Sequence, residues 1–168
     1  MGRDRLGTMV AGLALIGLGI AFLLAQWLGW DRIWPIFPVL GGLAFLGAYI
    51  GTGFQESGFI FVGTGAVLVG MFFFGFSFGV WEWEEMATLW PIFPILGGVA
   101  FVVMFLADRA RDWGVLGVGC AAMLVGLGGL AFTYGLVGSQ ILDLLPLLLV
   151  LIGLFSLVGA LIQMVRRR

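Results

Sequence analysis

The stretch WPIFPVLGGLAF at residues 34–45 recurs as WPIFPILGGVAF at residues 90–101, which is an offset of 56 residues. Ten of the twelve positions are identical, and the same offset aligns Gly19 with Gly75. A third, weaker copy follows, because LVGLG at residues 124–128 resembles the LIGLG that precedes the first motif. The sequence therefore predicts tandem units of about 56 residues.

Charged residues divide the rest of the chain into six uncharged stretches, and each has room for the ~20 apolar residues that cross a bilayer as a helix. Hydrocarbon offers no hydrogen-bond partner to an open backbone, so these stretches must be helical. We expect an all-α integral membrane protein with six transmembrane helices in three tandem hairpins. The expected hairpins are 1–56 (spans at about 6–28 and 34–53), 57–112 (about 58–80 and 88–107) and a degenerate 113–168 (about 113–134 and 143–165).

Each unit holds an even number of spans, so all copies should insert the same way up in a parallel-repeat arrangement. Many alternating-access transporters use inverted repeats instead. With six spans, both termini and the loops at residue 56 and at residues 108–112 lie on one side of the membrane. That side holds seven of the eight arginines, and the other side holds only Arg32. This distribution predicts that both termini are cytoplasmic.

The composition argues against a soluble domain and against catalysis. Of 168 residues, 62% are hydrophobic and 10% charged, whereas soluble domains are about 45–50% apolar and about 25% charged. The chain has no His, no Lys and a single Cys120, and the span centres carry no ionisable group that could mark an ion path. We expect no enzyme, no catalytic residue, no cofactor and no metal site. The net charge of −1 does not favour nucleic acid as a partner.

Two sets of residues stand out as candidate contact positions. The Trp-Pro-x-x-Pro motif is typical of a helix start anchored at the headgroup level, since Trp favours that level and Pro costs least in a first helical turn. The outer aromatic and acidic residues could alternatively recognise a partner or a lipid headgroup: Trp34, Trp81, Trp83, Glu84 and Trp90. Glycines at small-xxx-small spacing predict helix packing: Gly47, Gly51, Gly75, Gly79 and Gly126.

The segments LIGLGIAFLL (15–24) and WPIFPVLG (34–41), with the second copy at 90–97, resemble the LiaI/LiaF-type transmembrane region of bacterial envelope-stress proteins. The resemblance implies a sensor or regulator that is embedded in a bacterial inner membrane and acts by protein contact. We expect the soluble C-terminal domain of the LiaF type to be absent, since the sequence ends in Arg166-Arg167-Arg168.

These observations predict a non-enzymatic, multi-pass membrane protein with a regulatory, envelope-stress-like or scaffold role. Its expected partners are the lipid bilayer and other membrane proteins or further copies of itself. One alternative is an accessory structural subunit of a larger membrane complex. Another is a small-molecule or lipid transporter, which would need a polar cavity between hairpins.

Overall fold

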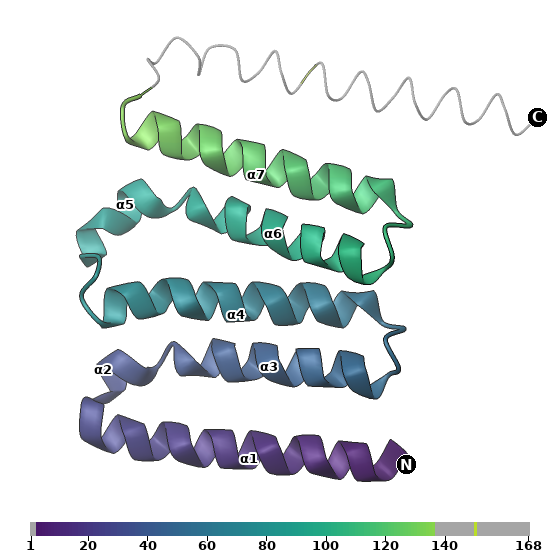
Figure 1. Cartoon of the computed structure of the whole chain (residues 1–168). Helices are drawn as coiled ribbons and strands as arrows, with labels where there is room; N and C mark the ends of the chain where they lie inside the picture. The colour runs from purple at the N-terminus through teal and green to yellow at the C-terminus, as the bar shows by residue number, and fades with distance from the viewer. Residues whose placement is uncertain (1–2, 137–149, 151–168) are drawn as a thin grey trace, which may run out of the picture. The chain divides into compact units, whose positions relative to one another are not determined.

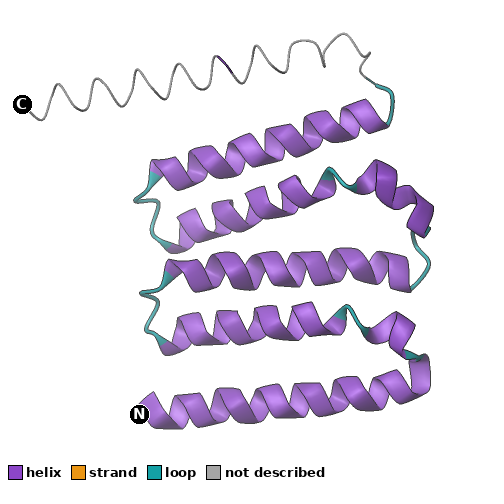
Figure 2. Ribbon diagram, turned by 180° about the vertical axis from the view of Figure 1, so that it is seen from behind, coloured by secondary structure: helices purple, strands orange, loops and turns teal. Residues whose placement is uncertain are grey.

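The computed structural model describes residues 3–136 and residue 150, and over 3–136 it consists of helices joined by short turns, with no β-strand (Figures 1 and 2). The chain divides into two compact units, Met1–Leu130 and Ala131–Arg168. The elements are α1 (Arg3–Leu28), α2 (Trp30–Ile33), α3 (Ile36–Gly51), α4 (Ser57–Ser77), the 3₁₀ turn η1 (Trp83–Glu85), α5 (Met86–Leu89), α6 (Ile92–Ala107) and α7 (Trp113–Thr133).

Four of the described segments are long and apolar enough to cross a membrane: Gly7–Leu28, Trp30–Gly51, Ser57–Ser77 and Trp113–Thr133. A fifth is added if Trp83–Leu89 and Ile92–Ala107, which meet at an angle of 62°, form one bent span. The prediction of a helical protein with membrane-spanning segments is confirmed to this extent. Except for residue 150, the expected last span at 143–165 lies outside the described residues.

The Trp-Pro-x-x-Pro motif begins α3, as expected, but it also separates α3 from a short preceding helix that the sequence did not predict. The one-turn helix α2 precedes the motif, and α3 begins just after Pro35. Pro38 has no N–H to offer the Trp34 carbonyl oxygen, and the Phe37 N–H donates to that oxygen at 3.2 Å instead. Proline removes an i→i−4 bond in this way and leaves a tighter i→i−3 turn.

The second motif has the same local structure. α5 ends just before Trp90, α6 begins after Pro91, and the Phe93 N–H donates to the Trp90 carbonyl oxygen at 3.1 Å. The bounds of α5, α6 and α7 are those of α2, α3 and α4 shifted by 56 residues. The repeat seen in the motif thus extends to the bounds of three helices, although α2 and α5 have no identical residue at this offset.

α3 and α4 pack through glycines, with their backbones in contact. A Cβ added to Gly42 would lie 2.6 Å from the Gly63 carbonyl oxygen, and one added to Gly70 would lie 2.9 Å from the Pro35 carbonyl oxygen. Real Cβ atoms do not come so close to backbone atoms, so only glycine permits this approach. Close approach matters because lipid supplies no hydrophobic drive between helices.

α6 and α7 use the same contact one offset later. A Cβ added to Gly98 would lie 2.6 Å from the Gly119 carbonyl oxygen, and one added to Gly126 would lie 2.6 Å from the Pro91 carbonyl oxygen. These four residues are the counterparts of Gly42, Gly63, Gly70 and Pro35 at +56. Two helix pairs in the chain thus share one mode of packing.

The glycines singled out from spacing have mixed roles. Gly126 lies in the α6–α7 contact just described, whereas an added Cβ at Gly75 would collide with the indole ring of Trp81. Gly51 and Gly79 have no atom within 4 Å of an added Cβ, so they do not pack against another described helix. Gly79 ends α4 with φ +72°, a left-handed position that favours glycine. Gly47 is half-buried within α3.

Candidate functional site

The aromatic end of α4 holds the main buried cluster of the described residues. Phe72, Phe76 and Leu89 are buried, and partly buried side chains pack around them: Phe73, Trp81, Met86, Ile92, Phe93 and Leu96. They come from α4, α5, α6 and the loop that joins α4 to η1. We call this set, together with Trp34 and Trp83, the aromatic cluster.

Two of the predicted contact residues are partly buried and pack against other residues of this cluster. The Trp81 ring lies against Gly75, with its centroid 5.4 Å from Phe72 and 5.6 Å from Phe76. Trp34 packs on Phe73 at a centroid distance of 5.0 Å. Their main contacts are therefore with the fold itself.

The other predicted contact residues remain accessible. Trp83 stacks on Phe76 at 5.0 Å yet is 53% exposed, and Trp90 is 52% exposed. Glu84 is exposed in η1. The Glu82 N–H donates to the Glu85 carboxylate at 3.2 Å, which fixes the turn around Trp83 and Glu84. Of the predicted contact residues, Trp83, Glu84 and Trp90 are thus the exposed ones at this end.

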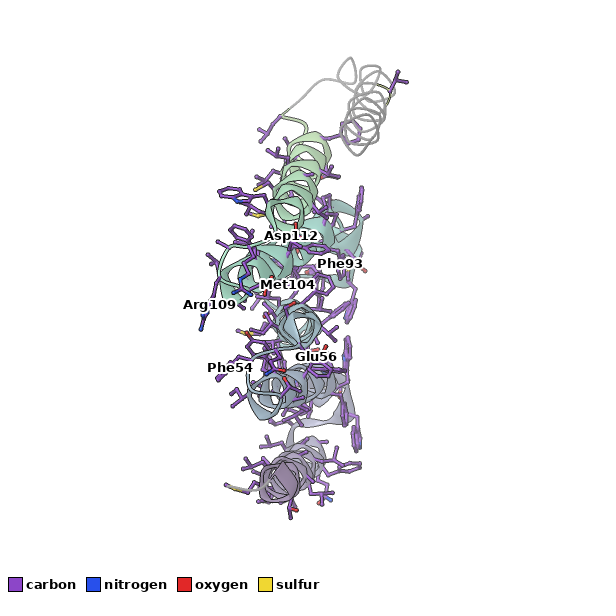
Figure 3. All side chains as sticks on the ribbon, turned by 90° about the vertical axis from the view of Figure 1, so that its right-hand side faces the viewer. Phe54, Glu56, Phe93, Met104, Arg109 and Asp112 are labelled. Carbon is purple, nitrogen blue, oxygen red and sulfur yellow. The ribbon has the colours of Figure 1, made fainter. Side chains whose placement is uncertain are left out.

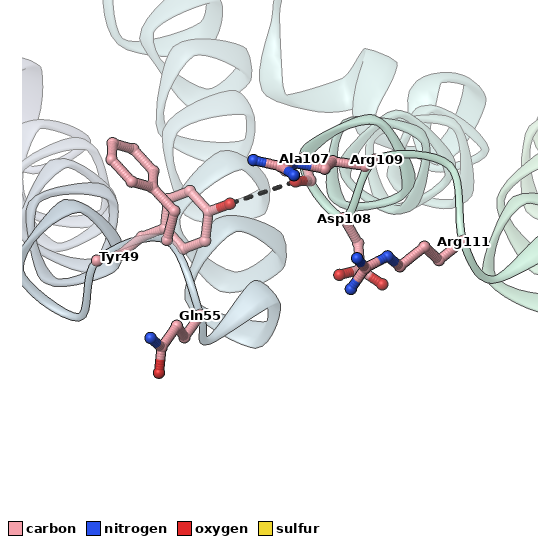
Figure 4. Close-up of a pocket in the computed structure, with 8 residues that line it drawn as sticks. Tyr49, Gln55, Ala107, Asp108, Arg109 and Arg111 are labelled. Atoms are coloured by element: carbon pink, nitrogen blue, oxygen red, sulfur yellow. Dashed lines mark hydrogen bonds between the residues drawn. The ribbon is translucent and has the colours of Figure 1, made fainter.

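A polar groove lies at the opposite ends of the same helices, between the α3–α4 turn and the α6–α7 turn (Figure 4). Its volume is about 640 Å³. Figure 3 views the helices from this end, with Phe54 and Arg109 of the two turns labelled. The groove is lined by Tyr49, Gly53, Phe54, Gln55, Ala107, Asp108, Arg109 and Arg111.

Tyr49 joins the two sides of the groove. Its side chain is only 6% exposed, and its hydroxyl donates a long hydrogen bond of 3.5 Å to the Ala107 carbonyl oxygen. The Phe54 ring meets the Tyr49 ring edge to face at 5.2 Å. Packing therefore holds the phenol in place more than its hydrogen bond does, since 3.5 Å is at the limit of hydrogen-bond length.

The two turns end their helices in the same way. The Gly53 N–H donates to Ile50 and the Phe54 N–H to Tyr49, which is the hydrogen-bond pattern of a Schellman motif. In the second turn, the Arg109 and Ala110 N–H groups make the equivalent bonds, to Leu106 and Phe105. Within residues 3–136, the non-glycine residues with positive φ are those of these turns: Phe54, Arg109 and Ala110.

Cationic side chains reach into the groove from one turn only. Arg109 and Arg111 extend from the α6–α7 turn toward Tyr49 and Gln55 on the other side (Figure 4). Asp108 also lines the groove. The nearby Asp112 carboxylate accepts the Gly114 N–H at 2.8 Å and so caps the start of α7. The arrangement offers hydrogen-bond donors to an anion.

The sequence analysis used Arg109 and Arg111 only to orient the chain and did not single out Tyr49 or Gln55. The groove joins turns 56 residues apart, so no local motif could reveal it. The repeat did hold a signal, because Arg109 and Arg111 stand where Gly53 and Gln55 stand in the preceding copy.

No group of three or more His, Cys, Asp or Glu side chains that could hold a metal ion occurs in the part of the chain that the structure describes. Comparison of the chain with protein-family models, with characterised proteins and with solved structures gave no match. The functional argument therefore depends on the geometry of this chain alone.

Proposed function

We propose that this chain is a multi-pass protein of a bacterial inner membrane that acts through protein–protein contacts in the bilayer and performs no catalysis. The observation that carries the proposal is a set of glycines on helix surfaces that face no neighbour within the part of the chain that the structure describes. An added Cβ would meet no atom within 4 Å at Gly7, Gly12, Gly19, Gly41, Gly97, Gly117 and Gly128.

Glycine inside a helix is about 0.5–1 kcal/mol less favourable than alanine. Gly42 and Gly98 offset this cost through backbone contact with the next helix, but their neighbours Gly41 and Gly97 make no such contact. In membranes, small residues on a helix face let another helix approach closely. The open glycines therefore support a further helix, from another protein or another copy of this chain, as the partner.

The proposed architecture is six spans in three tandem hairpins, with 143–165 as the last span and the arginine-rich side in the cytoplasm. The 56-residue shift between α2–α4 and α5–α7 and the arginine distribution support it. The resemblance to the LiaI/LiaF-type region supports an envelope-stress-like regulatory role. The open faces equally suit an accessory subunit of a larger membrane complex.

Single cysteines test the topology. In a Cys120→Ser background, we expect Glu84→Cys and Gln140→Cys to react with a membrane-impermeant maleimide added to intact cells. Glu56→Cys should react only after permeabilisation, because its loop belongs to the arginine-rich side. The Cys120→Ser chain alone serves as the unlabelled control. Labelling of position 56, but not 84 or 140, in intact cells would reverse the proposed orientation.

Photo-crosslinking tests the protein contact. Phe45 is one helical turn after Gly41 on the same face of α3 and is exposed. With benzoylphenylalanine at position 45, we expect a crosslinked protein adduct in native membranes. Gly41→Leu should remove most of this adduct, because the leucine side chain would fill the space that the glycine leaves open to a partner helix. The Gly41→Leu chain should keep its helical circular dichroism, since the site is open. Adducts with lipid alone, or a protein adduct that Gly41→Leu leaves unchanged, would contradict the proposal.

A further inference from the structure

The α6–α7 turn keeps a cationic residue where the backbone favours glycine. Arg109 has φ +54°, and its counterpart Gly53 has φ +70°. The left-handed conformation is about 1–2 kcal/mol unfavourable for a residue with a Cβ, whereas glycine adopts it freely. In the first copy, Gly53 forms the same turn without this strain. The turn therefore does not require an arginine at position 109. Such strain points to a function of the side chain.

The surroundings of Arg109 form a site that suits a phosphate group. Arg111 lines the same groove, and the Gln55 amide supplies a further donor, whereas the Tyr49 hydroxyl already donates to the Ala107 carbonyl oxygen. Guanidinium groups bind phosphate oxygens through paired, charge-assisted hydrogen bonds. Asp108 is the acidic residue among the lining side chains, so the arginines outnumber it. A volume of about 640 Å³ is in the range of small-molecule sites.

The place of the groove favours a lipid as the source of the phosphate. It lies at the ends of α3 and α6, which belong to segments apolar enough to span a membrane. Ile50 and Leu106, within one turn of those ends, are 56% and 65% exposed, as apolar side chains beside acyl chains would be. Basic pockets between helix ends on the cytoplasmic side suit anionic headgroups.

We propose that the polar groove binds the phosphate of an anionic phospholipid, with Arg109 and Arg111 as the ligands of the phosphate oxygens. The inference requires that the helices sit in a membrane. It is independent of the proposed protein contacts, because the lipid would bind the isolated chain.

Native mass spectrometry of the full chain in an uncharged detergent tests the proposal. The probes are dihexanoyl-phosphatidylglycerol, dihexanoyl-phosphatidylcholine and sodium phosphate. The double variant Arg109→Gly/Arg111→Gln introduces the residues of the first copy and should weaken phosphatidylglycerol binding about tenfold or more, as expected when charge-assisted bonds are lost. Arg32→Gln removes one arginine at the other end of the helices and should bind like the unchanged protein.

Thermal unfolding separates lost binding from lost structure. Arg109→Gly should unfold at an equal or higher temperature than the unchanged protein, since glycine relieves the left-handed strain. Tight binding of phosphatidylglycerol to the double variant would overturn the proposal, as would equal affinity for phosphatidylcholine. Binding of sodium phosphate as tight as that of phosphatidylglycerol would overturn the lipid as the source. None of these outcomes depends on partner proteins, so failure here leaves the proposed function standing.

Discussion

Gly42→Ala is expected to destabilise the protein by about 1–3 kcal/mol although it adds a single methyl group. The new Cβ would lie 2.6 Å from the Gly63 carbonyl oxygen and 2.8 Å from the Val67 nitrogen. Both are backbone atoms of α4, so neither can move aside as a side chain could. α3 and α4 would have to separate, and the contacts along the rest of their interface would weaken with them.

The neighbouring residue provides a matched control. Gly41→Ala adds the same methyl group one position earlier, where no atom lies within 4 Å, and should be neutral or stabilise the helix by up to about 1 kcal/mol. Loss of helical circular dichroism on heating in detergent measures both variants. Gly98→Ala and Gly97→Ala should repeat the contrast at the α6–α7 contact. Equal midpoints for Gly42→Ala and Gly41→Ala would show that the close helix approach contributes nothing to stability.

The contrast between Gly42 and Gly41 also shows why the glycines at the helix contacts could not all be predicted from the sequence. Small-xxx-small spacing finds glycines that share a face of one helix, but it does not say which face meets a neighbour. Gly126 was found in this way because Ala122 stands four residues before it, whereas Gly42 and Gly63 have no small residue four positions away. The repeat carried better information, since Gly42, Gly63 and Gly70 recur at +56 as Gly98, Gly119 and Gly126.

The helical segments themselves could be predicted closely from the spacing of charges. A charge inside a span is costly, so charged residues mark the ends, and the expected spans 58–80 and 113–134 lie close to Ser57–Ser77 and Trp113–Thr133. The short helices α2 and α5 were not expected. Each forms a single turn directly before a Trp-Pro-x-x-Pro motif. Because the motif was interpreted as the start of a helix, no helical turn was predicted before it.

Some residues at equivalent positions of the two copies differ in identity or in surroundings. Trp34 and Trp90 hold the same place in the motif, but Trp34 packs on Phe73, whereas Gly129 stands at the position 56 residues after Phe73. Trp90 is left half exposed. The same holds for the turns, where Gly53 is matched by Arg109. Differences between copies therefore indicate candidate contact residues better than the shared motif does.

Truncation of two tryptophans near the Trp-Pro-x-x-Pro motif should show a similar contrast between a packed residue and an exposed one. Trp81→Ala is expected to cost up to about 3 kcal/mol of stability, because its ring is partly buried between other rings and leaves a cavity that they cannot fill. The lost contacts are those with Gly75, Phe72 and Phe76. Circular dichroism and tryptophan fluorescence during thermal unfolding in detergent would report the change.

Trp90→Ala is the matched control, since it removes the same side chain from a half-exposed position. It should change stability by no more than about 0.5 kcal/mol, as for other surface substitutions. A Trp90 variant that folds normally can then be examined for lost protein adducts in membranes, which the Trp81 variant cannot. If Trp81→Ala were no more harmful than Trp90→Ala, Trp81 would not be part of the packed interior. Trp81 would instead be available for contact with a partner. The candidate contact surface at this end of the helices would then include the loop before η1 as well as Trp90.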